Sequence, residues 1–249
     1  MCGFTGFVQQ RAVAEGWEAI ADAMADTLVH RGPDDNGVWL DREAGVVLAH
    51  RRLAVLDLTP EGHQPMASAD GRCVIAYNGE IYNHAELRRE LSPHPWRGHS
   101  DTEVMLEAFS RWGVEATLGR LVGMFAFALW DRRERMLYLA RDRFGEKPLY
   151  YGRVGGVFLF GSELKALRAH PSWRAEVDRD ALTAYLRYGC VPAPHTIYRG
   201  IRKLPPGSFL AIAPDAPDVP APRRYWSCVE AATVAKSRPF AGSDREAAT

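Results

Sequence analysis

Short apolar stretches recur along most of the chain, with polar turn residues between them. Apolar and polar residues that alternate over a few positions predict strands at residues 2–9, 45–49, 73–77, 124–131, 136–140 and 157–161. Apolar residues spaced three and four apart predict amphipathic helices at 17–28, 84–91, 101–112 and 178–188. Strands and helices come in mixed blocks without strict alternation, which favours an α+β fold of packed layers over a parallel doubly wound sheet.

The C-terminal part of the chain has a different character. Residues 213–222 contain four prolines in ten positions, which predicts an extended segment outside a core. Residues 242–249 read as a capped helix start that stops within about one turn. We therefore expect the chain to be a piece of a longer protein.

Composition and charge exclude several functional classes. The chain has 249 residues, 31 basic and 31 acidic, so its formal charge is zero, whereas tight nucleic-acid binders usually carry a basic excess. The longest apolar run, 121–130, is far shorter than the roughly 20 residues that span a bilayer. The four cysteines form no CxxC pair, and the start lacks a signal peptide, so we expect a cytoplasmic protein with no membrane or nucleic-acid partner.

The second residue is the first candidate for chemistry. Methionine aminopeptidases remove Met1 when a small residue follows, and Cys2 would then carry both a thiol and a free α-amine. An α-amine with a pKa of about 7.7–8.0 can act as the base for its own nucleophile. The alternative interpretation is that a cysteine at this position is an accident of the start site.

Six segments, in order, give this cysteine a context. They read Met-Cys-Gly-Phe at 1–4, His-Arg-Gly-Pro-Asp at 30–34, Ala-His-Arg-Arg-Leu-Ala-Val-Leu-Asp at 49–57, Tyr-Asn-Gly-Glu-Ile-Tyr-Asn at 77–83, Ser-Asp-Thr-Glu-Val at 100–104 and Ala-Arg-Asp-Arg-Phe-Gly-Glu-Lys-Pro-Leu-Tyr-Tyr at 140–151. Residues 2–211 thereby resemble the N-terminal glutaminase domain of glutamine-hydrolysing asparagine synthetases, a class II glutamine amidotransferase domain. The resemblance implies an α+β fold, the four-layer αββα sandwich of N-terminal-nucleophile hydrolases.

The resemblance also implies a catalytic set. Cys2 matches the nucleophile that attacks the glutamine side-chain amide, which gives a thioester and ammonia. Asn78 and Gly79 match the oxyanion hole, with one side-chain amide and one backbone N–H. The alternative for Asn-Gly is a type I′ hairpin turn without a chemical role.

The substrate-binding residues follow from the same matches. Arg52 matches the arginine that binds the α-carboxylate of glutamine, and its alternative is a surface charge beside a buried strand. Asp101, with Glu80, matches the groups that hold the α-amino end, although helix N-capping also explains an acid there. The remaining residues implied at the pocket are Leu53, Ala54, Val55, Leu56 and, over the bound substrate, Arg31.

Other expectations concern what lies outside the glutaminase site. Residues 212–249 are expected to be a proline-rich connector and the start of a truncated synthetase domain, and ATP and magnesium are expected only in that domain. The glutaminase domain itself is expected to need no cofactor or metal, because its eight histidines form no HxH or HxxxH set. Residues 141–151 are expected to form a buried ion network.

Several alternatives stay open at this point. The simplest function is glutamine hydrolysis that supplies ammonia for the amidation of aspartate to asparagine. The absent domain selects the acceptor, so the carboxylate of a surface sugar or a secondary metabolite is the first alternative. A non-catalytic docking or regulatory module is the second, and a homodimer is neither required nor excluded.

Overall fold

Two six-stranded antiparallel sheets form the centre of the molecule. The computed structural model describes residues 1–9, 16–237 and 242. The first sheet has the strand order β10 (Ile201–Lys203), β8 (Tyr150–Val154), β9 (Val157–Gly161), β1 (Gly3–Val8), β3 (Val46–Arg52), β2 (Asp35–Asp41). The second has the order β12 (Arg223–Arg224), β11 (Ser208–Ile212), β7 (Met136–Arg141), β6 (Gly123–Asp131), β5 (Cys73–Ile81), β4 (Met66–Ala67).

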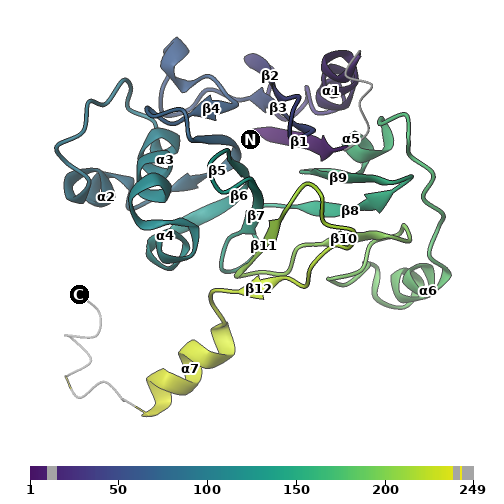
Figure 1. Cartoon of the computed structure of the whole chain (residues 1–249). Coiled ribbons are helices and arrows are strands. Elements are labelled where there is room, and N and C mark those ends of the chain that lie inside the picture. Colours follow the sequence, from purple (N-terminus) through teal and green to yellow (C-terminus); the bar gives the residue numbers. More distant parts are fainter. Residues whose placement is uncertain (10–15, 238–241, 243–249) are drawn as a thin grey trace.

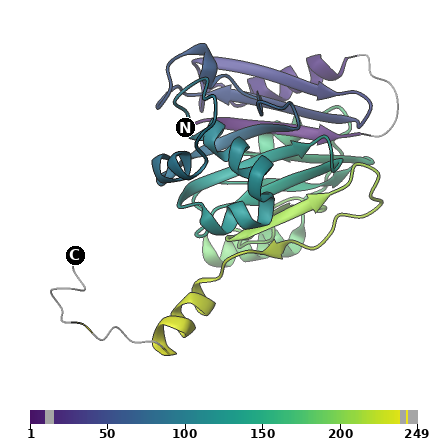
Figure 2. The ribbon, with the colours of Figure 1, turned by 60° about the vertical axis from the view of Figure 1, so that its left-hand side comes forward.

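Helices cover the outer face of each sheet (Figures 1 and 2). The first sheet carries α1 (Trp17–Asp26) and α5 (Leu164–Arg168). The second carries α2 (His84–Glu90), α3 (Asp101–Trp112) and α4 (Val114–Arg120). The expected αββα four-layer sandwich is therefore confirmed.

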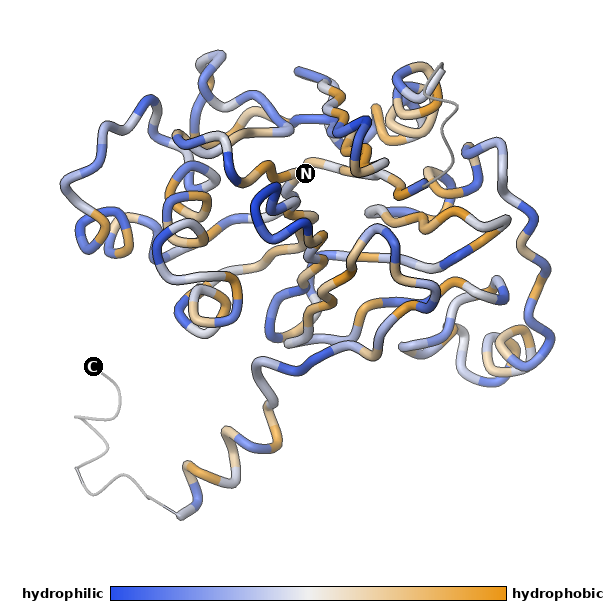
Figure 3. Tube along the Cα trace, in the orientation of Figure 1, coloured by the Kyte–Doolittle hydropathy of each residue, from blue (hydrophilic) through white to orange (hydrophobic). Residues whose placement is uncertain are grey.

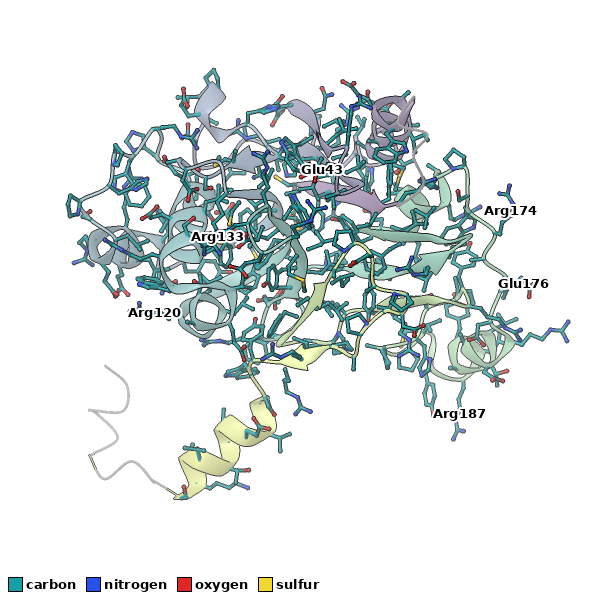
Figure 4. All side chains as sticks on the ribbon, viewed as in Figure 1. Glu43, Arg120, Arg133, Arg174, Glu176 and Arg187 are labelled. Atoms are coloured by element: carbon teal, nitrogen blue, oxygen red, sulfur yellow. The ribbon has the colours of Figure 1, made fainter. Side chains whose placement is uncertain are left out.

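Three apolar clusters hold these layers together, and burial of apolar surface is the dominant favourable contribution to such packing. Phe4, Leu48, Trp130 and Phe160 lie between the two sheets. Phe109 and Phe127 join α3 to the second sheet, with their ring centroids 5.2 Å apart. Hydrophobic residues follow the strands and the inner helix faces, and hydrophilic residues occupy the outer loops (Figure 3). Charged side chains such as those of Arg174 and Glu176 project outward (Figure 4).

Most predicted elements exist, with shifted ends. The predicted helices 17–28, 84–91, 101–112 and 178–188 correspond to α1, α2, α3 and α6 (Arg179–Tyr188). The six predicted strands correspond to β1, β3, β5, β6, β7 and β9. The elements that the pattern missed are β2, β4, β8, β10, β11, β12, α4, α5, the 3₁₀ turn η1 (Pro60–Gly62) and α7 (Cys228–Ser237).

The segment after residue 211 contributes to the second sheet before it leaves the body. Strand β11 continues to Ile212, and β12 pairs with it antiparallel through Arg223 and Arg224. Helix α7 then extends away from the sandwich (Figure 1), and none of its residues is buried. The predicted helix start at 242–249 lies outside the described residues, apart from residue 242. No helix among the described residues is long and apolar enough to cross a membrane.

The two sheets pack against each other near the N-terminus. Strand β1 lies beside β3 in the first sheet, so Gly3 pairs with Arg51. Strands β1 and β3 also pack against β5 of the second sheet, and the N-terminal end of β1 lies beside β5 in Figure 1. The folding pattern thus brings segments near residues 2, 52, 79 and 101 to one place.

Candidate active site

The thiol of Cys2 is held by the segment that follows β3. The backbone N–H of Leu53 donates to Cys2 Sγ at 3.3 Å, and Leu53 O lies 3.5 Å from the same sulfur. Burial raises the pKa of the Cys2 thiol, and the hydrogen bond from Leu53 only partly opposes this effect. The thiol is therefore mostly protonated at neutral pH, and a nucleophilic role requires a nearby base.

Arg31 fixes the backbone of the same residue. Its Nε donates to Cys2 O at 2.9 Å, and its Nη1 donates to Glu163 Oε1 at 2.9 Å. His30 and Lys165 also contact the Glu163 carboxylate, at 3.0 and 3.2 Å. Arg31 therefore holds the Cys2 backbone and does not line the pocket.

Arg52, at the end of β3, is a buried cation without an acidic partner. Its guanidinium donates to Asp57 O and, at 3.3 Å, to Thr59 O. It makes no ion pair within 4.0 Å in the described part of the chain. A Cβ at Gly62 would lie 1.9 Å from Arg52 Nη2, so only glycine leaves room for this side chain.

The neighbouring arginine, Arg51, lies on the opposite face of β3 and is only partly exposed. Arg51 pairs with the Asp26 carboxylate on α1, as the alternation of β3 requires, because successive side chains of a strand point to opposite faces. The two adjacent arginines thus have different environments, and only Arg52 is directed toward the site.

Asn78 and Gly79 lie inside strand β5, opposite Ala126 and Phe125 of β6. The hairpin-turn alternative for these residues is therefore wrong. Asn78 is 1% exposed, and its Nδ2 has no hydrogen-bond partner among the described residues. A Cβ at Gly79 would lie 2.3 Å from Met124 O, so β6 approaches too closely for any other residue.

The backbone of Gly79 points away from β6. Phe125, its pairing partner, uses its own N–H and C=O on Asp142, on the side of β7. Gly79 and Phe125 are therefore a non-hydrogen-bonded pair, and the Gly79 N–H faces the outer edge of β5. Asn78 Nδ2 and the Gly79 N–H are therefore two donors on adjacent residues without a partner among the described residues.

Two carboxyl groups, those of Glu80 and Asp101, lie near the C-terminal end of β5. Asp101, the first residue of α3, accepts from Ile81 N at 2.8 Å and from Tyr77 Oη at 2.7 Å, both at Oδ2. Ser100 supplies the N-cap of α3, so the capping alternative for Asp101 is wrong. Burial raises the pKa of Asp101 despite these hydrogen bonds, and burial together with the Asp101 charge raises the pKa of Glu80.

A small pocket brings most of the sequence-predicted residues together. Those that line it are Cys2, Arg52, Leu53, Val55, Leu56, Gly79, Glu80 and Asp101. Three predicted residues lie outside the lining. Asn78 is buried behind it, Ala54 donates its N–H to Asp34 Oδ2 at 2.9 Å, and Arg31 contacts the Cys2 backbone.

The pocket also contains residues that sequence reasoning missed, namely Asp57, Gly62, Gln64, Tyr77, Ser100 and Thr102. Asp57 holds the loop around Arg52. Although its burial alone raises the pKa, hydrogen bonds from His99 N and Thr59 lower the pKa of Asp57 below its ordinary value. Asp57 and Tyr77 lie within segments that carried the resemblance, whereas Gln64 had no signal of its own.

The charged side chains of Arg141 and Asp142 form hydrogen bonds with backbone groups. They do not form the buried ion network that we expected. The fully buried Asp142 carboxylate accepts from the N–H groups of Phe125, Phe144, Glu146 and Lys147. Arg141 donates to the carbonyls of Gly145, Lys147 and Leu204. Lys147 is 5% exposed and places Nζ 3.1 Å from Met1 Sδ. No group of three or more metal-ligating side chains is found in the described ranges.

A glutamine amidotransferase domain family matches residues 1–226 of this chain. The chain belongs to that family. The chain is 42% identical over 232 residues to "Asparagine synthetase [glutamine-hydrolyzing] 3" of Bacillus subtilis, which covers 91% of this chain and 37% of the relative. It is 39% identical over 219 residues to "Asparagine synthetase [glutamine-hydrolyzing] 1" of the same organism. This match covers 86% of this chain and 34% of the relative.

The fold recurs in a solved structure of glutamine phosphoribosylpyrophosphate amidotransferase from B. subtilis, complexed with ADP and GMP. The likeness has a TM-score of 0.65 at 19% identity and covers 91% of this chain and 49% of the other. This likeness agrees with the predicted αββα fold. The chain is thus a glutamine amidotransferase domain, and it spans little more than a third of the length of the two asparagine synthetases.

Proposed function

We propose that this domain hydrolyses glutamine to glutamate and ammonia through a thioester on Cys2. The observation that carries the proposal is the pocket itself, which brings Cys2 together with Gly79, the residue that follows the unpaired amide of Asn78. Asn78 Nδ2–H and Gly79 N–H suit the oxygen of a tetrahedral intermediate, because preorganised donors stabilise the charge that develops there.

The reaction begins with Met1 removed. The pKa of the Cys2 thiol is raised by burial, so a base must take its proton, and the free α-amine of the same residue can do so. With Met1 attached, that nitrogen is an amide and is not basic. Met1 removal is therefore required for activity.

Thioester formation, loss of ammonia and hydrolysis then follow in turn. The sulfur attacks the side-chain amide carbon of glutamine, and the carbonyl oxygen becomes an oxyanion bound by Asn78 and Gly79. The α-ammonium of Cys2 returns its proton to the leaving nitrogen, and ammonia departs as the carbon–nitrogen bond breaks. Water then attacks the thioester carbon, which releases glutamate and regenerates the thiol.

The rest of the pocket matches the amino-acid end of glutamine. Arg52, a buried cation that contacts only carbonyls, suits the α-carboxylate. Asp101 and Glu80 suit the α-ammonium, because a cation between them offsets the cost of two buried acids. Leu53, Val55 and Leu56 border the side chain, and Arg31 holds the nucleophile's backbone.

We further propose that residues 2–211 carry the glutaminase unit and that 212–249, after β12 has joined the second sheet, connect it to a synthetase domain. The relatives named above are glutamine-hydrolysing asparagine synthetases, and the chain spans only part of their length. The ammonia would then be used to amidate a carboxylate that another part of the protein activates with ATP and magnesium, most simply that of aspartate.

The first test is glutamate release from glutamine by the purified chain whose N-terminus, Cys2, has been verified by mass. Cys2→Ala should abolish release, and Cys2→Ser should retain only a small fraction, because a hydroxyl is the weaker nucleophile. A matched control is Cys73→Ala, which removes a buried thiol distant from the pocket lining. Equal activity in Cys2→Ala and the unaltered chain would overturn the proposal.

A further inference from the structure

Within the described ranges, the outer edge of β5 has a neighbouring strand along only a short part of its length. Strand β4 has two residues and pairs only with Val74 and Ile75. Pro65 precedes it and has no N–H, so the ladder cannot continue in that direction. Every second residue of β5 beyond this point exposes an N–H and a C=O that need other partners.

Side chains from other elements supply these partners. Gln64 Oε1 accepts from Tyr77 N at 2.8 Å, and His50 Nε2 lies 2.9 Å from Tyr77 O. At the other end, Asp101 accepts from Ile81 N at 2.8 Å, and His84 Nδ1 lies 2.8 Å from Ile81 O. Gly79 lies between Tyr77 and Ile81 in this row, and its backbone groups have no such side-chain partner in the described structure.

His50 reaches this edge from the opposite sheet. It lies on β3, is fully buried and does not line the pocket. Because a carbonyl only accepts, Nε2 must carry the proton, while Nδ1 has no partner among the described residues. Burial lowers the pKa of His50 to about 4, so the ring stays neutral and acts as a single fixed donor at neutral pH.

We propose that His50 is a positioning residue that holds the Tyr77–Asn78 peptide so that Asn78 and Gly79 present their donors to the oxyanion. Gln64 holds the opposite side of the same residue and shares this role. The inference rests on the proposed glutaminase function. A hydrogen bond to the Tyr77 carbonyl fixes the plane of the peptide that leads into Asn78, and small displacements of oxyanion donors strongly reduce their effect.

The test compares three variants of the chain with free Cys2. His50→Leu removes the donor at similar volume, and His50→Gln restores an N–H at similar reach. His170→Leu is the matched control, since His170 is also buried with an unpaired Nε2 but packs on Phe7, outside the pocket lining. We expect His50→Leu to lower kcat about 10- to 100-fold with KM changed less than about twofold.

A second readout separates positioning from general loss of structure. The aldehyde analogue of glutamine adds to Cys2, where the sulfur bonds to the aldehyde carbon and the proton goes to its oxygen, which then occupies the oxyanion site. His50→Leu should weaken this inhibitor by the same factor as kcat, while Cys2 alkylation by iodoacetamide stays unchanged. His50→Gln should recover most of both, and His170→Leu should affect neither.

The outcomes distinguish the two proposals. Unchanged kcat and inhibitor affinity in His50→Leu overturn the positioning role and leave the glutaminase function standing. A parallel loss of kcat and alkylation that His50→Gln does not rescue also overturns it. If His50→Leu does not fold, Gln64→Met removes the partner of the Tyr77 N–H and should show the same loss of kcat and inhibitor affinity. No glutamate release from the unaltered chain overturns the proposed function, and the role of His50 with it.

Discussion

Two buried side chains at the pocket or directly beside it have polar groups that lack an ion-pair or hydrogen-bond partner in the described protein. Buried Arg52 contacts only carbonyls, and Asn78 Nδ2 has no partner in the part of the chain described. An unsatisfied buried polar group costs about 1–3 kcal/mol, so such groups are rare away from functional sites. In the glutaminase that we propose, bound glutamine would supply the missing partners.

Arg52 gives the first prediction at this scale. Arg52→Met keeps the aliphatic stem and removes the charge, so KM for glutamine should rise about 10- to 100-fold, the worth of a charge-assisted hydrogen bond of about 1.5–3 kcal/mol. Steady-state glutamate release measures this change. Arg51→Met is the control, because Arg51 pairs with Asp26 on α1 and should leave KM unaltered.

The acid pair gives a second prediction. The pKa values of Asp101 and Glu80 are both raised by burial, so these carboxyls take up protons at a higher pH than ordinary acids do. As pH falls, they lose the charge that binds an ammonium, and KM for glutamine should rise while the pH is still above the usual carboxyl range. A KM that is flat from pH 7 to pH 5 would contradict this assignment, and Glu80→Gln should reduce the rise.

At the scale of elements, β5 shows where sequence reasoning succeeded and failed. The alternation predicted a strand over 73–77, because Asn78 and Gly79 resemble a turn. The strand continues to Ile81 because Asp101 and His84 satisfy its end from other elements. The contact of Asp101 with Ile81 joins residues 20 positions apart, and that of His50 with Tyr77 joins residues 27 positions apart, so local patterns do not contain them.

The same reason explains which parts of the site were predictable. Cys2, Arg52, Asn78 and Asp101 lie in segments whose local order carries the family resemblance. His50 lies in such a segment too, whereas Gln64 does not. The hydrogen bonds of both residues to Tyr77 join separate segments, so they follow only from the fold. Strands β2 and β8 were missed because polar residues and Gly152 interrupt their apolar alternation.

Gly79 gives the prediction for this element. A Cβ there would meet Met124 O at 2.3 Å and Phe125 Cα at 2.7 Å, so Gly79→Ala should lower the free energy of unfolding by about 1–3 kcal/mol and abolish glutamate release. Gly119→Ala on α4 is the contrasting control, because its Cβ meets no described atom within 4 Å. It should stabilise the helix by about 0.5–1 kcal/mol without loss of activity. Urea unfolding measures both.

For the whole molecule, stacking two sheets between helices places neutral histidines in the interior. Burial lowers the pKa of both His50 and His170 to about 4. For His50, Asp35 opposes this shift, whereas Arg52 and His63 add to it. Between pH 6.5 and pH 4, the unfolded chain therefore binds more protons than the folded chain at these two residues, and their contribution to stability falls as the pH falls.

His170→Leu isolates this effect, because Asp101 and Glu80 titrate in the opposite sense and are present in both proteins. Each buried histidine changes the free energy of unfolding by up to about 1.4 kcal/mol per pH unit. The stability of His170→Leu relative to the unaltered chain should thus rise by about 2 kcal/mol between pH 7 and pH 5. Urea unfolding at both values measures this difference. A constant difference would mean that His170 takes up its proton at the same pH in the folded and the unfolded chain, since only equal protonation of the two states leaves stability independent of pH.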